Sequence, residues 1–195
     1  MKSLRELEAS WRRIESWLSV NAPTSHACVN APAESREIDE AEATMGLAFP
    51  PELLGLLHLS NGCTEPPENP DAAAFLPGGQ RLLGAAEIAA YRQGQLVQVE
   101  TSDLDEDEAA LWWHRAFVPF TEHTSPMCLL IDQRSGPHHG AVRNWMDETG
   151  PSKPRWPSLN GFLAAVADAL EGGPAVRGKL PYAEGEGVLA WRPVQ

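Results

Sequence analysis

Apolar residues recur with a helical period near both ends of the chain. Residues 3–19 carry one apolar stripe at spacings of three and four, formed by Leu4, Leu7, Trp11, Ile14 and Leu18. Residues 158–171 carry a second stripe, formed by Leu159, Phe162, Leu163, Val166 and Leu170, with Ser158 in the N-cap position and Gly172-Gly173 at the end. The spacing predicts an amphipathic helix at each end, with its apolar face toward the core.

Two shorter helices are predicted between residues 35 and 62. Ser35 can cap the first of them, and Gly46 ends it. The second lies in FPPELLGLLHLSNG, residues 49–62, where two prolines open the helix and five leucines leave almost no polar face. Asn61-Gly62 then accepts positive φ and turns the chain. This segment is predicted to be a deeply packed helix that belongs to the scaffold.

The middle of the chain changes from helical to strand periodicity. Residues 72–76 are expected to form a short strand and residues 85–93 a helix, which the acidic run at 100–108 either extends or follows as an exposed loop. Strands are predicted at 115–120, 127–132 and 141–146, joined by connections of hairpin length. The order predicts an α+β fold, a mostly antiparallel sheet of five to six strands with helices packed on one face and at the ends.

Length and composition fit one globular domain. We assign residues 1–173 to it and treat residues 174–195 as a C-terminal tail that can add a strand. The first residues do not form a signal peptide, and no apolar run is long enough to cross a bilayer. Three widely spaced cysteines give neither a disulfide framework nor a metal-ligand spacing. These features favour a cytoplasmic protein with reduced thiols, and no membrane partner is expected.

The net charge of −12 is unevenly distributed. ETSDLDEDE, residues 100–108, holds six acids and no base. A second acidic loop contains Glu65 and Glu68. Nucleic acid would be repelled by such a chain, whereas a basic protein would be attracted to it. The candidate partner-binding acids are Asp103, Asp105, Glu106, Asp107, Glu108, Glu65 and Glu68. The alternative is that both runs are solvated faces that keep the protein soluble.

Tryptophans could supply an anchor beside these acids. If the segment around Trp112 and Trp113 is extended, one of the two rings faces outward next to the acidic run, and we name Trp113 as the candidate. Trp156 lies on a proline-rich loop and is the second candidate. The alternative for both rings is packing in the core.

Several pieces of the chain, in this order, resemble one known family, the SUKH superfamily. They are the helix WRRIESWL, the segment REIDEAEATMGLAFPPELLGLLHLSNG, the strand and turn FLPGGQRLLGAAEI, the tryptophan-bearing WWHRAFVPF, the hairpin LLIDQRSGPHHGAVRNW and the helix SLNGFLAAV. An acidic, proline-rich insertion after Asn61-Gly62 and the tail after Gly173 depart from the pattern. The superfamily contains yeast cell-wall-synthesis regulators and many bacterial immunity proteins.

The resemblance implies a non-enzymatic protein-binding module. An immunity protein that binds and neutralises a basic toxin domain is the leading interpretation. An intracellular regulatory or scaffold protein is the alternative, and an enzyme of unrecognised type ranks last. The resemblance leaves the toxin, the interface and the oligomeric state open.

No catalytic motif stands out in the sequence, and no cofactor or metal is expected. His138-His139 beside Asp132 could suggest a metal site, but adjacent histidines in a Gly-Pro turn favour an exposed loop. Cys63 could act as a nucleophile with His58, but a buried thiol is the favoured interpretation, as it is for Cys128. Asp132 ends a strand, where a carboxylate commonly caps the next turn.

Overall fold

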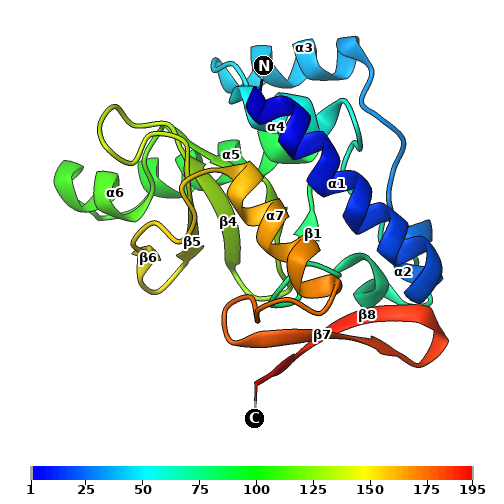
Figure 1. The fold of residues 1–195 in the computed structure, drawn as a ribbon. Coiled ribbons are helices and arrows are strands. Elements are labelled where there is room, and N and C mark those ends of the chain that lie inside the picture. The colour runs from blue at the N-terminus through cyan, green and yellow to red at the C-terminus, as the bar shows by residue number, and fades with distance from the viewer. Residues whose placement is uncertain (1, 195) are drawn as a thin grey trace.

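The computed structural model describes residues 2–194, apart from the side chains of Lys2, Glu106 and Asp107 (Figure 1). The helices are α1 (Lys2–Asn21), α2 (Pro23–Ala27), α3 (Ser35–Met45), α4 (Pro51–Leu57), α5 (Ala85–Glu100), α6 (Glu106–Trp112) and α7 (Leu159–Leu170), with the 3-10 turns η1 (Pro70–Ala73) and η2 (Gly185–Gly187). The strands are β1 (Arg81–Leu82), β2 (Phe117–Pro119), β3 (Thr121–Glu122), β4 (Met127–Asp132), β5 (Ala141–Met146), β6 (Gly150–Pro151), β7 (Lys179–Glu184) and β8 (Val188–Pro193).

All strand pairs among the described residues are antiparallel, and the predicted α+β class is confirmed. The largest sheet has the order β2-β4-β5-β6, and β1-β3 and β7-β8 form two-stranded sheets. The backbone of Phe120 connects the first two of these sheets. Its oxygen accepts from the N–H of Leu83 at 3.0 Å, and its N–H donates to the oxygen of Leu129 at 3.0 Å. The strands expected at 115–120, 127–132 and 141–146 are therefore present, but in place of one sheet of five to six strands there are a four-stranded sheet and two two-stranded sheets.

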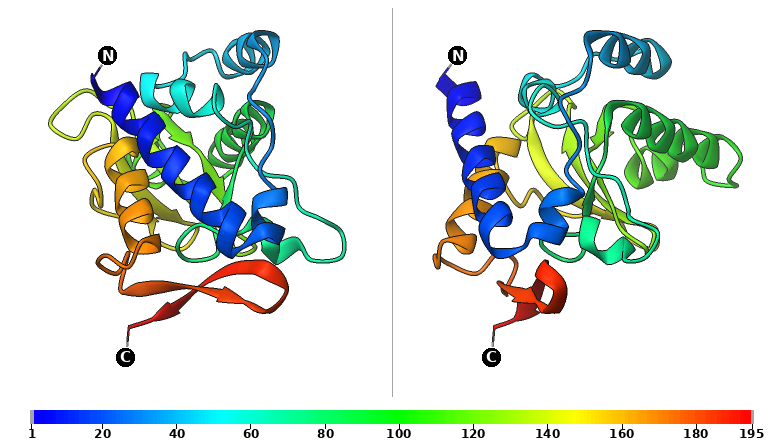
Figure 2. Two further views of the ribbon diagram at one scale, coloured as in Figure 1. Left: turned by 45° about the vertical axis from the view of Figure 1, so that its right-hand side comes forward. Right: turned by 90° about the vertical axis from the view of Figure 1, so that its right-hand side faces the viewer.

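Helices cover both faces of the central sheet, whereas the sequence pattern predicted one covered face. Along β4, Leu129 and Ile131 contribute to the main core, and Cys128 and Leu130 to a second, smaller cluster. The main core lies under α1, α4 and α7, and the second cluster lies under α5 and the end of α6 (Figure 2). The uninterrupted apolar run of β4 is the reason, because a strand buried on both sides shows no polar alternation.

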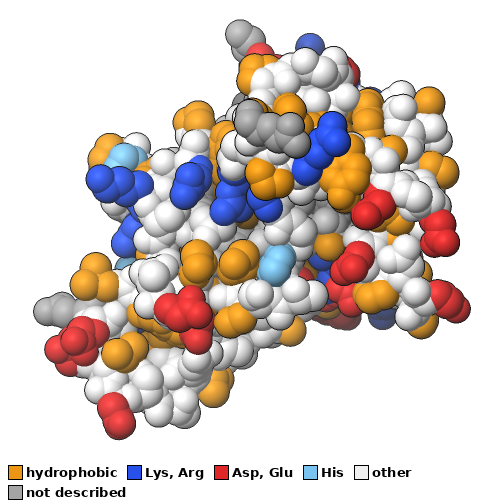
Figure 3. Space-filling model, turned by 90° about the horizontal axis from the view of Figure 1, so that it is seen from below, with side chains coloured by type: hydrophobic (Ala, Val, Ile, Leu, Met, Phe, Trp, Pro, Cys, Tyr) orange, Lys and Arg blue, Asp and Glu red, His pale blue; other side chains and the backbone are white. Residues whose placement is uncertain are grey.

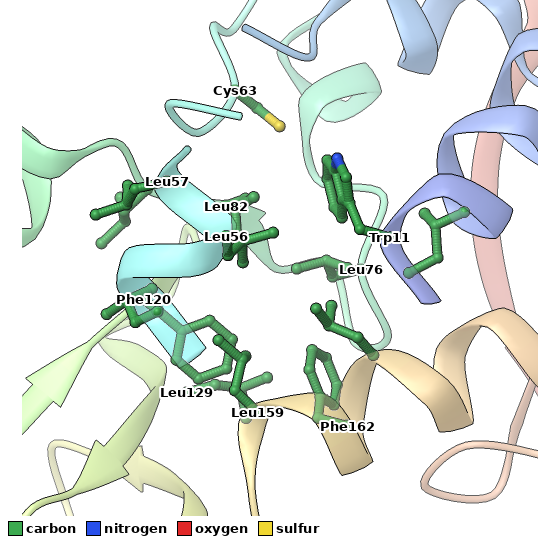
Figure 4. Packing of buried hydrophobic residues seen from close by; sticks show 14 of the residues in the cluster. Trp11, Leu56, Leu57, Cys63, Leu76, Leu82, Phe120, Leu129, Leu159 and Phe162 are labelled. Atoms are coloured by element: carbon green, nitrogen blue, oxygen red, sulfur yellow. The ribbon is translucent and has the colours of Figure 1, made fainter. Parts of the chain in front are cut away.

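The main core joins segments that are distant in sequence (Figure 4). Trp11 of α1, Leu56 of α4, Phe162 of α7 and Phe120, which follows β2, belong to one apolar cluster. The predicted α1 stripe is buried from Leu7 onward, but Leu4 at its start is 40% exposed. Each helix therefore contributes one apolar face to a shared interior.

Asn61-Gly62 forms the tight turn that the sequence predicted. Gly62 has a φ of +75°, and a Cβ added there would lie 2.3 Å from the backbone nitrogen of Gly84. The side chain of Asn61 accepts a hydrogen bond from the N–H of Ala85 at 2.8 Å. The turn after α4 therefore packs directly against the start of α5, and only glycine fits at its tip.

Two of the residues that were predicted to begin or end a helix do so, and one does not. Ser158 caps α7 by accepting from the N–H of Gly161, and Gly46 ends α3 with a φ of +61°. Ser35 does not cap α3, because Glu34 occupies that position and its N–H bonds the side chain of Glu37.

Residues 72–76 begin in a 3-10 turn instead of the expected strand. The tail, which the sequence allowed to add a strand, forms two strands that pair as the β7-β8 hairpin.

Candidate protein-binding surface

The acidic run forms a short projecting element that we call the acidic arm, residues 101–112. Helix α5 ends at Glu100, a turn follows, and α6 leads back to the body of the protein (Figures 1 and 2). The carboxylate of Asp105 caps α6 by accepting from the N–H of Glu108 at 2.9 Å, and the side chain of Glu108 accepts from the N–H of Asp105 at 3.4 Å. Acidic residues in a first helical turn also complement the helix dipole. Part of the acidic run therefore has a structural role.

The acidic arm also carries apolar side chains that face solvent. Asp103, Asp105 and Glu108 are exposed, and so are Leu104 at 41% and Leu111 at 70%. The side chains of two candidates, Glu106 and Asp107, lie outside the described part of the structure. Carboxylates next to exposed leucines combine long-range attraction for a basic surface with apolar area that a partner can cover.

The base of the acidic arm is fixed by hydrogen bonds to the β5-β6 turn. Trp112 Nε1 donates to the backbone carbonyl oxygen of Asp147 at 2.6 Å, and Trp145 Nε1 donates to the backbone carbonyl oxygen of Trp112 at 2.8 Å. Gly150 has a φ of +66°, and a Cβ there would lie 3.3 Å from the oxygen of Leu111. These contacts hold the acidic arm in one orientation.

Trp113 is not an outward anchor, so the interpretation as a partner-binding ring is wrong. Its side chain is only 2% exposed, because α6 ends at Trp112 and the chain then turns inward. The ring packs edge-on against Trp145, with centroids 5.2 Å apart, and against Phe117 at 6.0 Å. Trp113 therefore belongs to the second apolar cluster.

Trp156 is half-buried and packs against the main core. Its ring centroid lies 4.8 Å from that of Phe162, and its backbone bridges to Val142 of β5. This packing favours the structural interpretation that the sequence left open for Trp156.

The second acidic region surrounds a buried arginine that the sequence analysis missed. Arg81 forms ion pairs with Glu65 at 3.2 Å, with Glu87 at 2.9 Å and with Glu122. Burial alone would lower the pKa of Arg81, but its bonds and charge interactions with Glu122 and Glu87 outweigh that effect and raise it. Three carboxylates around one guanidinium leave an excess of negative charge.

A cavity of about 350 Å³ opens beside this cluster and is lined by Glu65, Arg81 and Glu87, among others. Glu68 is exposed on the same loop. Arg81 itself could have been noticed as a charge inside an apolar stretch, RLLG.

The two acidic regions do not come together. Glu87 lies in the first turn of α5, and the acidic arm follows its last turn. A helix of 16 residues is about 24 Å long. They are therefore two separate surfaces, and we take the acidic arm as the candidate binding site because it also exposes apolar area.

Asp132 has the structural role that the sequence favoured. It is 1% exposed and caps the following turn by accepting from the N–H of Arg134 at 3.0 Å. Its Oδ2 accepts from Arg134 Nη2 and from Arg143 Nε, each at 2.8 Å. Burial alone would raise the pKa of Asp132, but hydrogen bonds from Arg134 and the charges of both arginines hold it below its usual value.

The candidate reactive groups differ in their exposure. His138 and His139 are exposed, and in the described part of the chain no three His, Cys, Asp or Glu side chains are grouped as metal ligands would be. Burial raises the pKa of the Cys63 and Cys128 thiols to about 12 each, which disfavours the nucleophilic thiolate. His58, by contrast, is exposed.

Comparison with known proteins identifies the family. A family model described as the SMI1 / KNR4 family (SUKH-1) matches residues 32–165, which is more than half of the chain. The chain belongs to the SMI1/KNR4 family. The matched region of this family member contains the acidic arm and the Arg81 cluster, and it excludes α1 and the β7-β8 hairpin.

One relative is a KNR4/SMI1 homolog from Eremothecium gossypii, 30% identical over 79 residues. This match covers 40% of the chain and 12% of the relative's length. No helix among the described residues is long and apolar enough to cross a membrane.

Proposed function

We propose that this SMI1/KNR4 family member is an immunity-type binding module that neutralises a basic toxin domain through its acidic arm. Family membership supports a protein-binding role. The observation that carries the choice of surface is the combination, on one projecting element, of exposed carboxylates with Leu104 and Leu111.

Binding would proceed in two physical stages. The carboxylates attract a basic partner from a distance, which raises the association rate and makes it sensitive to salt. Burial of Leu111 then slows dissociation, because apolar area removed from water stabilises the complex. A nuclease or similar enzyme needs a basic surface to hold phosphates, so an acidic element can cover that surface without any chemical step.

The fixed geometry of the acidic arm assists this mechanism. Trp112 holds its base to the β5-β6 turn, and Asp105 and Glu108 hold the first turn of α6. A surface that is already ordered loses less conformational entropy when it binds. Masking by such a surface is non-enzymatic and suits a protein that meets the toxin in the cytoplasm.

Co-expression tests the proposal. The protein encoded beside this gene is expressed as the candidate toxin, alone or with the full chain, and growth is measured. We expect wild-type chain to restore growth, and a variant with Leu111→Asp and Glu108→Gln to restore it less. The control variant carries the same two types of change on α1, Val20→Asp and Glu15→Gln. Val20 is 76% exposed there, so it matches the exposed Leu111.

The result also separates the two interpretations of the family. If no neighbouring protein is toxic and the chain instead stably binds a protein of its own cell, the regulatory or scaffold function replaces this proposal. If growth is restored equally by both variants, neutralisation does not depend on the acidic arm.

A further inference from the structure

Within the described part of this acidic protein, several basic side chains form no ion pair. The sequence holds 27 acids and 15 bases, so carboxylates are abundant. Yet none of the ion pairs found between described residues includes Lys153, Arg155 or Arg177, all of which are exposed. Figure 3 shows Lys and Arg side chains in a band across one half of the face seen from below, while most Asp and Glu side chains lie at the lower left and along the right.

Contacts link these exposed bases to the half-buried Arg134 and to the buried Arg143. We call this set the basic band: Arg134, Arg143, Lys153, Arg155 and Arg177. Asp132 holds the first two together, as described above. Arg143 Nη1 also donates to the backbone carbonyl oxygen of Ser152 at 2.8 Å, and Ser152 directly precedes Lys153. The backbone N–H of Arg155 donates to Val142 of β5 at 2.9 Å. The basic band therefore extends from the end of β4 and from β5 to the segment that follows β6.

The orientation of the edge segment exposes two of these bases. Residues 150–156 run antiparallel to β5, and Ser152 and Trp156 both contact it. Trp156 packs inward against the main core. Lys153 and Arg155 lie at bends in this segment, and both are exposed, whereas Trp156 is half-buried.

Arg177 continues the basic band from the loop after α7. Its φ of +54° is unusual for a residue other than glycine. Its guanidinium reaches the Gly78 turn, where an added Cβ would lie 3.4 Å from Nη1. Partial burial and then the nearby charge of Arg155 lower the pKa of Arg177. The two arginines repel each other, and neither takes part in an ion pair found among the described residues. An anionic partner would relieve that repulsion.

We propose that the basic band is a docking surface for an acidic segment of a partner protein. A nucleic acid fits less well, because its extended backbone would meet the carboxylates around the basic band and the net charge of −12. A short acidic peptide covers the basic band alone. This surface is distinct from the acidic arm, and the inference does not depend on the proposed function.

Fluorescence anisotropy tests the docking surface with a labelled oligoglutamate peptide as the probe. The full chain should bind it at low ionic strength, and binding should weaken as salt is added. The variant Arg155→Gln, Arg177→Gln should bind about tenfold more weakly, which corresponds to about 1.4 kcal/mol. Arg12→Gln, Arg36→Gln is the matched control, since it removes two exposed charges from α1 and α3 and should bind as wild type does.

Each other outcome overturns the inference. No binding by the wild-type chain, or equal loss in the control, means that the basic band is not a docking surface. Tighter binding of a labelled single-stranded oligonucleotide than of oligoglutamate assigns the surface to nucleic acid instead. If a variant folds poorly, the wild-type chain still provides a test, because its binding of oligoglutamate should weaken as salt is added.

Discussion

Replacing Asp132 by asparagine removes the carboxylate that links the sheet to two arginines. Asparagine has nearly the same shape, so the change leaves packing almost intact. It replaces one acceptor oxygen by an NH₂ group that faces donors from Arg134 or Arg143. The side chain of Arg143 is only 10% exposed, and it keeps only its bond to the backbone oxygen of Ser152 when the NH₂ group takes the position of Oδ2.

The structure sets the expected magnitude. Removing one partner of a buried ion pair costs about 3–5 kcal/mol, because the remaining charge stays buried and unpaired. Arg134 is 33% exposed and can turn toward water, so we expect a loss of about 3 kcal/mol. The matched control is Asp168→Asn. That carboxylate pairs with Arg13 at 2.7 Å but is 54% exposed, and its loss should cost less than about 1 kcal/mol.

Urea unfolding followed by fluorescence measures both variants. The pH dependence gives a second check. The folded pKa of Asp132 is depressed, so its contribution is fully present above the unfolded pKa of about 3.9 and is lost as pH falls through the folded value. The stability difference between wild type and Asp132→Asn should therefore shrink in that acidic range. Equal, small losses for Asp132→Asn and Asp168→Asn would refute the reasoning.

Three further predictions concern the turn, the cap and the core. Gly62→Ala should lower the free energy of unfolding by more than about 2 kcal/mol, because φ is positive and the new Cβ meets Gly84. Gly172→Ala, with φ of +89° but open space around it, should lower it by only about 1 kcal/mol. Chemical denaturation compares the two variants, and equal losses would show that the close approach is unimportant. Asp105→Ala should cost about 1 kcal/mol and Asp105→Asn almost nothing, because asparagine also caps helices; a comparable loss in both would contradict the capping role. Trp113→Ala should cost about 3–5 kcal/mol in the same assay, and a fully stable variant would show that the ring is not core.

Local patterns predicted the helices α1, α3, α4, α5 and α7 and the strands β2, β4 and β5. The α1 stripe from Leu7 to Leu18, the Ser158 cap and the Gly62 turn depend on residues close in sequence, so periodicity and turn chemistry reveal them. The position of α5 and α6 on the second face depends on the two-sided burial of β4. An apolar run cannot show this by itself, because it fits a strand and a buried helix segment equally well.

The candidate surface was predicted only in part. The acidic run is visible in the sequence, but its helix, and the caps formed by Asp105 and Glu108, need the geometry of α6. The pairing of Arg81 with Glu122 joins residues 41 positions apart, and the approach of Arg155 to Arg177 spans α7. Such long-range pairs leave no periodic signal in one sequence.

The association rate of the neighbouring toxin candidate with this SMI1/KNR4 family member tests the central claim most directly. The variant Asp103→Asn, Asp105→Asn, Glu108→Gln keeps cap-forming side chains and removes three charges from the acidic arm. The control Asp39→Asn, Glu184→Gln, Glu186→Gln removes three exposed charges elsewhere. Measured by stopped flow at low ionic strength, association of the arm variant should be about tenfold slower than wild type, with a weaker salt dependence, and the control should change little. An unchanged rate and salt dependence for the arm variant would contradict binding through the acidic arm.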